Sequence, residues 1–339
     1  MFLKALEDRA RDARPRANRR AAFEASHLEV RLFHVGHGEA ILVIFGNNRA
    51  WLIDAGSNSE RRCKLLGERL IAYLDERDLT LEALVPSHPH RDHAGTFETI
   101  LGSSSPRIAS PLMIYRSADP SWHSTAGWRK RFRDAIEARQ ARGDQVVEIV
   151  LSNAHREVSI ADRLEAHLFA GSGEGPYTTL FVHLRFRDAR LLFTGDALCG
   201  YEIELLDKFG PGDFRADMLK VTHHGSSSGT AQTVVEAVRP AIAIASTGDG
   251  AGHRLERDTL DRLGGRPLKG RPGPRRIFET LVDGDIVVRT DGNPYGGGIL
   301  YQVEFESPGR FVEGLGAEIM SLKDVDSQRT TSDNNPECA

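Results

Sequence analysis

One short segment of the chain combines the residue types that bind metal ions. His88, His90, Asp92 and His93 fall within six positions, directly after the apolar run 81–85. Side chains two positions apart on an extended chain point the same way, so His88 and His90 can hold one cation. Asp92 and His93 then turn toward a second cation. This spacing predicts a two-metal hydrolase. A solvated histidine-rich turn is disfavoured, because candidate ligands recur downstream.

The segment from His88 to His93 matches the HxHxDH signature of the metallo-β-lactamase superfamily, which the chain resembles. Further motifs are similar to the hydrolase domain of the ComEC competence-protein family. The resemblance covers residues 28–305 and implies an α/β fold, the four-layer αββα metallo-β-lactamase sandwich. The motifs are Val35-Gly36-His37-Gly38-Glu39-Ala40-Ile41, Leu52-Ile53-Asp54-Ala55-Gly56, Leu192-Phe193-Thr194-Gly195-Asp196-Ala197, His223-His224-Gly225-Ser226, and Ser246-Thr247-Gly248 followed by Gly252-His253.

The resemblance also implies ligands for two divalent metal ions. His88 and His90 hold one ion, and Asp92 and His93 hold the other. Asp196 bridges the two ions, and His253 is the last ligand of the second. Ions about 3.5–4 Å apart activate water at neutral pH and polarise the bond under attack, so the implied reaction is hydrolysis.

One position departs from the pattern of many superfamily members. They supply a further histidine to the first ion from the segment before the bridging aspartate, where this chain has Tyr177-Thr178-Thr179. ComEC-type domains lack that histidine as well. We expect the nearby His155, His167 and His183 to be structural. The first ion then keeps open positions, and because harder ions suit such a site, Mn²⁺ is an alternative to Zn²⁺.

Two consecutive histidines, His223 and His224, lie between the bridging aspartate and the last ligand. The arrangement is similar to ribonuclease Z, in which a histidine followed by small hydroxyl residues acts at the scissile phosphate. One of the pair could protonate the leaving oxygen or hold a phosphate, and the other could bind a metal ion. Together with Asp92 they are the candidate catalytic residues. Which of the two histidines has which role stays open.

Each candidate ligand follows a run that is typical of a β-strand. Loops at the carboxyl ends of strands converge on one crevice of an α/β sheet, so we expect distant ligands to meet there. Asp54 also ends such a run, and its carboxylate either supports a metal ligand or caps a turn. The strand-like runs include 81–85, 191–194, 219–222 and 241–245, and apolar spacing predicts a helix over 63–77.

We expect one catalytic domain over residues 28–306, containing an insertion-like segment at 106–165. Trp122, Trp128 and Phe132 in that segment either anchor it to the core or stack nucleobases. A basic N-terminal extension at 1–27 precedes the domain, and a tail at 307–339, disordered from about 321, follows it. The loop 264–276 is basic and is the densest candidate for phosphate contacts.

Composition limits the partners. The net charge of −4 and the isoelectric point near 6.4 argue against a broadly basic nucleic-acid surface, so phosphate contacts must be local. Residues 1–20 lack the apolar core of a secretory signal, and no stretch approaches the roughly twenty apolar residues that cross a bilayer. We therefore expect a cytoplasmic protein without a membrane span. Its protein partners are unknown.

The leading hypothesis is a metal-dependent phosphodiesterase that acts on nucleic acid or a nucleotide through a metal-activated hydroxide. The second is a hydrolase of esters, thioesters or lactams, which the missing histidine disfavours because glyoxalase-like and lactamase-like members usually retain it. The third is a non-catalytic binding protein that kept the fold. The complete set of candidate ligands from His88 to His253 disfavours that reading.

Overall fold

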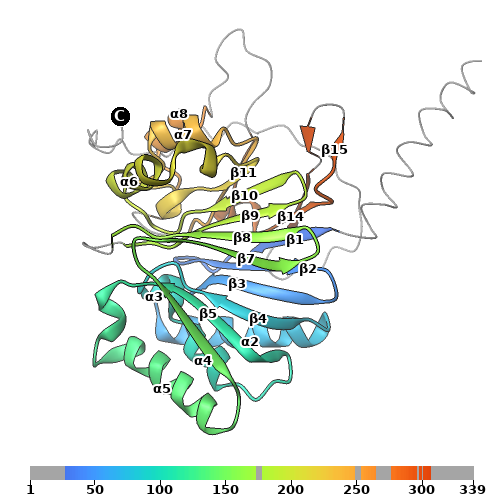
Figure 1. The fold of residues 1–339 in the computed structure, drawn as a ribbon, viewed down its shortest axis with the longest axis vertical. Coiled ribbons are helices and arrows are strands. Elements are labelled where there is room, and N and C mark those ends of the chain that lie inside the picture. The colour runs from blue at the N-terminus through green and yellow to red at the C-terminus, as the bar shows by residue number, and fades with distance from the viewer. Residues whose placement is uncertain are drawn as a thin grey trace, which may run out of the picture.

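The computed structural model describes residues 27–172, 178–248, 253–264, 276–295, 298–299 and 301–306. Two β-sheets pack face to face, and helices cover the outer face of each sheet (Figure 1). This is the four-layer αββα sandwich that the sequence resemblance implied, and the predicted fold class is confirmed.

The first sheet has eight strands in the order β17-β14-β1-β2-β3-β4-β5-β6. Pairing is antiparallel from β17 to β3 and parallel from β3 to β6. The strands are β1 (Leu28–Leu32), β2 (Ala40–Phe45), β3 (Arg49–Ala55), β4 (Thr80–Val85), β5 (Ile108–Ser117), β6 (Val146–Leu151), β14 (Asp285–Thr290) and β17 (Gln302–Glu306).

The second sheet has seven strands in the order β13-β12-β11-β10-β9-β8-β7. Pairing is parallel from β13 to β10 and antiparallel from β10 to β7. The strands are β7 (His155–Ala161), β8 (Leu164–Phe169), β9 (Phe181–Phe186), β10 (Ala189–Phe193), β11 (Met218–Lys220), β12 (Ile242–Ala245) and β13 (Arg276–Glu279), and a separate ribbon pairs β15 (Pro294–Tyr295) with β16 (Gly298–Ile299).

The helices divide between the two outer layers. Apolar residues of α2, α4 and α5 pack on the first sheet, and those of α6, α7 and α8 pack on the second (Figure 1). The helices are α2 (Glu60–Glu76), α3 (Arg91–Ala94), α4 (Phe97–Gly102), α5 (Gly127–Ala141), α6 (Cys199–Phe209), α7 (Gln232–Val238), α8 (Arg257–Arg262) and α9 (Thr280–Asp283), with 3₁₀ turns η1 (Pro120–His123), η2 (Pro211–Phe214) and η3 (Thr222–Gly225).

Local sequence explains the elements that lead to the site. The β2–β3 turn places Asn47 and Asn48 at φ values of 64° and 56°, which asparagine tolerates and a tight hairpin requires. Helix α2 begins at the cap residue Ser59, whose side chain accepts a hydrogen bond from the Arg62 amide. Its buried face includes Leu66, Leu70 and Leu74, in agreement with the predicted helix.

The segment 106–165, for which we expected an insertion-like character, contributes strands to both sheets. It contributes β5 and β6 to the first sheet and β7 to the second. Trp122, Trp128 and Phe132 are buried, and the rings of Trp122 and Phe132 lie 5.6 Å apart. These aromatic residues therefore serve as core anchors and are not available to stack nucleobases.

Three predictions fall wholly or largely outside the described residues. They concern the N-terminal extension, the C-terminal tail and most of the basic loop 264–276, including Arg266, Lys269, Arg271 and Arg275. Among the residues that the structure describes, no helix combines the length and apolar character needed to cross a bilayer.

Candidate metal centre

The candidate ligands gather where strands of both sheets end. His88 and His90 follow β4, Asp196 follows β10, and His223 and His224 follow β11. His93 Nε2 lies 3.0 Å from an oxygen of Asp196, although His93, in α3, follows a strand of the first sheet and Asp196 follows a strand of the second. The convergence expected from the strand ends is therefore present.

Glycine at two positions lets the loops of the site approach each other. A Cβ on Gly56, at the end of β3, would lie 2.2 Å from the carbonyl oxygen of Arg91 and 2.4 Å from the carbonyl carbon of Asp92. A Cβ on Gly248, after β12, would lie 2.3 Å from the carbonyl of Gly36. Both contacts are too short for any larger residue. The candidate metal-binding loop thus rests directly on neighbouring backbone.

Four side chains form a compact group of donor atoms: Asp92, His93, Asp196 and His224, with one ligand atom of each within 4.8 Å of the others. His224 Nε2 lies 3.1 Å from His93 Nε2 and 3.3 Å from Asp196 Oδ2. It also lies 3.8 Å from Asp92 Oδ2. The structure therefore brings together three of the predicted metal ligands and one of the two consecutive histidines.

The hydrogen bonds behind two of these imidazoles fix which nitrogen faces the group. His224 Nδ1 lies 3.0 Å from the carbonyl oxygen of Ser246, which can only accept, so Nδ1 carries the proton. His93 Nδ1 lies 2.9 Å from Asp54 Oδ2 and donates to that carboxylate. Both Nε2 atoms consequently face each other and the carboxylates, so they are the nitrogens that could bind a metal ion, and without one His93 Nε2 shares a proton with Asp196. Asp54 therefore orients the candidate ligand His93, which is one of the two roles that the sequence allowed for it.

His88 is fixed by the same carboxylate through one more residue. The Ser87 hydroxyl donates to Asp54 Oδ2 at 2.7 Å, and the Ser87 amide donates to Oδ1 at 2.6 Å. The hydroxyl has one proton, so it accepts at 2.9 Å from His88 Nδ1. His88 Nε2 then carries a lone pair and no proton. This atom is buried and has no hydrogen-bond partner among the described residues.

This donor set fits a divalent cation. Lone pairs and carboxylate oxygens 3.0–3.3 Å apart repel one another unless a positive charge lies between them. That separation is close to the roughly 3.3 Å expected between ligand atoms about 2 Å from one tetrahedral ion. Buried atoms without partners, His88 Nε2 and Asp196 Oδ1, point to the same conclusion.

Without a metal ion, the pKa values of His93 and Asp196 lie far from their usual values. Burial favours neutral forms, but Asp196 and Asp54 outweigh it and hold the pKa of His93 well above its usual value. Burial likewise opposes ionisation of Asp196, yet His224 and His93 hold its pKa well below the usual range. The buried carboxylates therefore demand compensating positive charge, which protons or a cation can supply.

His253 lies in a second group of three donors with His37 and Asp92. His37 Nε2 is 3.6 Å from Asp92 Oδ2, and the rings of His37 and His253 are 3.1 Å apart. Burial, His224 and His37 lower the pKa of His253 to about 3, so its ring is neutral and can act as a ligand. His253 therefore adjoins the predicted ligand Asp92, and His224 occupies the compact group instead.

The predicted ligands of the first ion, His88 and His90, have ring centroids 4.5 Å apart at 75°. The His88 ring also lies 4.3 Å from that of His93. Among the described residues, neither belongs to a group of three donors within 4.8 Å. The pair thus adjoins the compact group, and its role as the ligands of a first ion remains a prediction.

The side chains of His223 and His224 lie in different surroundings. Both have left-handed backbone, with φ of 51° at His223 and 54° at His224, which is strained for residues other than glycine. His224 is fully buried among the donors, whereas the His223 side chain is 24% exposed. His223 Nε2 lies 3.9 Å from Asp196 Oδ2, and its Nδ1 contacts the Ser228 hydroxyl at 2.8 Å. Only His223 is accessible from solvent.

Sequence reasoning missed three residues of the site. His37 was part of a recognised motif, but no role was predicted for it; its position between two glycines, before a strand, was the available signal. The other two, Glu39 and Lys220, form a fully buried ion pair. Lys220 Nζ also donates to the Gly195 carbonyl at 3.1 Å and lies 4.0 Å from Asp196 Oδ1. The ammonium group of Lys220 therefore supports the loop that carries Asp196.

A sequence profile described as "Metallo-beta-lactamase superfamily" matches residues 35–249, and the chain belongs to this superfamily. Two curated relatives confirm the resemblance to the ComEC family. The chain is 27% identical over 221 residues to Recombination protein 2 of Haemophilus influenzae, covering 65% of this chain and 24% of the relative. It is 26% identical over 242 residues to ComE operon protein 3 of Bacillus subtilis, covering 66% and 29%. The chain thus spans less than a third of either relative.

Solved structures with similar folds are more distant. The metallo-beta-lactamase fold protein YhfI from Bacillus subtilis is 14% identical with a TM-score of 0.47, covering 76% of this chain and 98% of that one. The short form of human tRNase Z is also 14% identical, with a TM-score of 0.39 and coverage of 63% and 91%.

Proposed function

We propose that this protein is a metal-dependent phosphodiesterase that acts on nucleic acid or a nucleotide. The observation that carries the proposal is the convergence of imidazole lone pairs on two carboxylates, around Asp196, with His93 and His224 locked by their Nδ1 hydrogen bonds. Such a set is suited to Zn²⁺ or Mn²⁺ and has no comparable structural use.

The metal ligands in this proposal are His88, His90, Asp92, His93, Asp196, His224 and His253. A bound pair of divalent ions would supply activated water and polarise the phosphoryl oxygen. Asp92 is only partly buried, so its carboxylate can contact both a bound metal ion and the substrate. The missing histidine leaves room at His88 and His90, which favours a substrate oxygen or water there.

His223 is the candidate proton donor. Its Nε2 atom lies near Asp196 and its ring is partly open to solvent, so a leaving oxygen can reach it. Ser228 holds Nδ1, which fixes the ring direction. Burial lowers the pKa of His223 against the opposing effect of Asp196, so the neutral ring is favoured at neutral pH, and the proposed role of proton donor rests on the position of the ring.

The preference for a phosphodiester rests on the relatives and on the expected phosphate contacts of the basic loop 264–276. The name Recombination protein 2 refers to a process that acts on DNA, and the chain shares its hydrolase-like segment with that protein. The expected phosphate contacts of the basic loop 264–276 remain a prediction. A cytoplasmic location likewise remains a prediction.

Metal analysis of the purified full chain, combined with a substrate screen, tests this proposal. Bis-p-nitrophenyl phosphate, single-stranded DNA and nitrocefin should each be incubated with Zn²⁺ or Mn²⁺. Hydrolysis of the two phosphodiesters and not of nitrocefin is the expected result. Turnover of nitrocefin or a thioester alone would replace the proposal with an ester or lactam hydrolase. Metal binding without any turnover would indicate a binding protein.

A further inference from the structure

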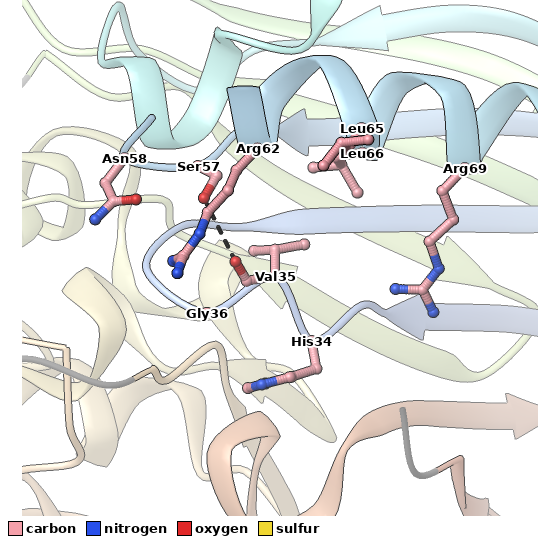
Figure 2. A pocket seen from close by; sticks show the side chains of 9 residues that line it. All are labelled: His34, Val35, Gly36, Ser57, Asn58, Arg62, Leu65, Leu66 and Arg69. Atoms are coloured by element: carbon pink, nitrogen blue, oxygen red, sulfur yellow. Dashed lines mark hydrogen bonds between the residues drawn. The ribbon is translucent and has the colours of Figure 1, made fainter. Parts of the chain in front are cut away.

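A pocket of about 520 Å³ lies between helix α2 and the loop that follows β1. Figure 2 shows Arg62 and Arg69 extending from α2 toward the loop that carries His34 and Gly36. Arg62, Leu65, Leu66 and Arg69 are spaced i, i+3, i+4 and i+7, so a single stripe of the helix forms this wall. The pocket is therefore a product of α2 and lies outside the group of metal ligands.

The lining of the pocket is cationic. It includes Arg62 and Arg69, and none of the nine lining residues is an aspartate or glutamate. Arg69 is neutralised, because its Nη2 atom lies 2.5 Å from an oxygen of the buried Asp285. The amide of His34 donates to the other oxygen of the same carboxylate at 2.7 Å. One of the two arginines thus has a structural partner.

Arg62 is different. Within the part of the chain that the structure describes, no side chain or carbonyl pairs with its guanidinium. Its Nη1 atom would lie 3.2 Å from a Cβ on Gly36, so the guanidinium lies over the glycine backbone. An arginine presents a planar fork of donors that matches a phosphate or carboxylate. The pocket therefore offers one uncompensated, anion-binding group.

The same pocket also has apolar surface. Leu65 is 53% exposed, and Leu66 and Val35 line the wall beside it. A large aliphatic side chain exposed at a pocket rim is a surface that a flat apolar group can cover. A ligand that satisfies both parts carries an anion joined to a planar or apolar body, which is the composition of a nucleotide.

The pocket adjoins the metal centre through His37. The carbonyl of His37 accepts hydrogen bonds from the Asn58 amide at 3.0 Å and the Ser57 hydroxyl at 3.1 Å, and both donors line the pocket. The imidazole of the same residue faces Asp92 at 3.6 Å. One loop residue thus contacts both the lining of the pocket and the candidate ligand Asp92.

We propose that this pocket binds a nucleotide unit of the substrate next to the scissile phosphodiester. The phosphate of that unit contacts Arg62, and its base lies against Leu65 and Val35. This inference rests on the proposed function and specifies its substrate: a nucleic-acid strand with at least one nucleotide beyond the bond that is cut. A small phosphodiester that lacks this unit leaves the pocket empty.

Arg62→Gln tests the inference by kinetics, with Arg61→Gln as the matched control. Arg61 is the neighbouring exposed arginine on α2 and does not line the pocket. For Arg62→Gln, we expect the KM for a short oligonucleotide to rise about tenfold more than the KM for bis-p-nitrophenyl phosphate, the size of one charge-assisted hydrogen bond. Arg61→Gln should match wild type on both. Equal effects of Arg62→Gln on the two substrates would overturn the inference while leaving the phosphodiesterase proposal intact.

A binding measurement separates the pocket from catalysis. The full chain carrying Asp196→Asn is titrated calorimetrically with a 5′-phosphorylated thymidine dinucleotide and with inorganic phosphate. We expect the dinucleotide to bind more tightly than phosphate, Arg62→Gln to weaken both, and Leu65→Ser to weaken only the dinucleotide. This result would support the pocket even if wild type hydrolyses no phosphodiester. Equal affinity for the dinucleotide and phosphate, or binding unaffected by Arg62→Gln, would overturn it.

Discussion

The Nε2 atoms of His93 and His224 lie 3.1 Å apart, although the two residues are 131 positions apart in the sequence. Each ring donates its Nδ1 proton to a separate acceptor, Asp54 for His93 and the Ser246 carbonyl for His224. The two Nε2 atoms are therefore held face to face beside Asp196, and a proton or a metal ion must lie between these groups. This arrangement is unfavourable without a cation, so metal binding and folding stability should be coupled.

The first prediction concerns metal removal. Adding Zn²⁺ or Mn²⁺ to chelator-treated protein should raise the melting temperature, because a ligand at 100 times its Kd stabilises the folded state by about 2.7 kcal/mol. Differential scanning calorimetry at several metal concentrations measures the shift. The control is Mg²⁺, which binds imidazole poorly and should have a smaller effect. Identical melting curves with and without Zn²⁺ and Mn²⁺ would contradict the assigned ligands.

Asp92→Ala and Asp196→Ala should each reduce phosphodiester hydrolysis at least about a hundredfold, because each removes a charge that holds a cation. Both proteins should remain soluble and folded by circular dichroism. Asp188→Ala, in the exposed turn between β9 and β10, is the matched control and should retain wild-type turnover. Normal turnover in either of the first two variants would exclude the two-metal mechanism.

The two consecutive histidines should separate by phenotype. His224→Ala removes a buried candidate ligand and should lower the metal content measured by mass spectrometry. His223→Ala should retain metal but lower kcat, since its ring is the accessible one. If both variants bind metal and turn over normally, neither histidine belongs to the site.

Asp54→Asn tests the orientation of the ligands. Asparagine tolerates the positive φ of 52° at this position, but it loses a carboxylate oxygen that orients His93 and Ser87. Loss of such a hydrogen-bond partner lowers metal affinity by about 10- to 100-fold. Competition with a chromogenic chelator measures the Kd. An unchanged Kd would show that the Nδ1 hydrogen bond of His93 is dispensable.

The last prediction concerns pH and a residue far from the metal ligands. Burial, followed by the charge of Arg185, lowers the pKa of His183 to about 3, so the unfolded chain binds its proton more readily. Between pH 6.5 and 3 the unfolded state holds more protons, and the stability from this group falls as pH falls, by up to about 1.4 kcal/mol per pH unit. Above pH 6.5 the contribution is complete.

Urea unfolding at pH 7.5 and pH 5 measures this dependence. His183→Leu should reduce the loss of stability between the two pH values. His123→Leu, at an exposed position of η1, is the control and should keep the wild-type loss. A loss in His183→Leu equal to that of wild type would contradict the assignment.

The features that depend on short-range spacing could be predicted from the sequence. The alternation in His88-Pro89-His90-Arg91-Asp92-His93 is local, so it predicted the metal-binding loop, and the motifs around it predicted the superfamily and its sandwich. The strand-end placement of Asp54 and Asp196 followed from the short apolar runs 50–53 and 191–194 before them. These features need no knowledge of distant neighbours.

Tertiary structure alone decided which residues complete the site. His223 and His224 are equivalent in sequence, and only the left-handed backbone after β11 turns one ring inward and the other toward solvent. Glu39 and Lys220 are distant in sequence, and burial in a shared low-dielectric space pairs them. Arg61 and Arg62 are likewise adjacent and identical, yet the packing of α2 against the loop after β1 directs only Arg62 into the pocket. Side-chain direction and long-range packing make these distinctions, and neither is encoded in local spacing.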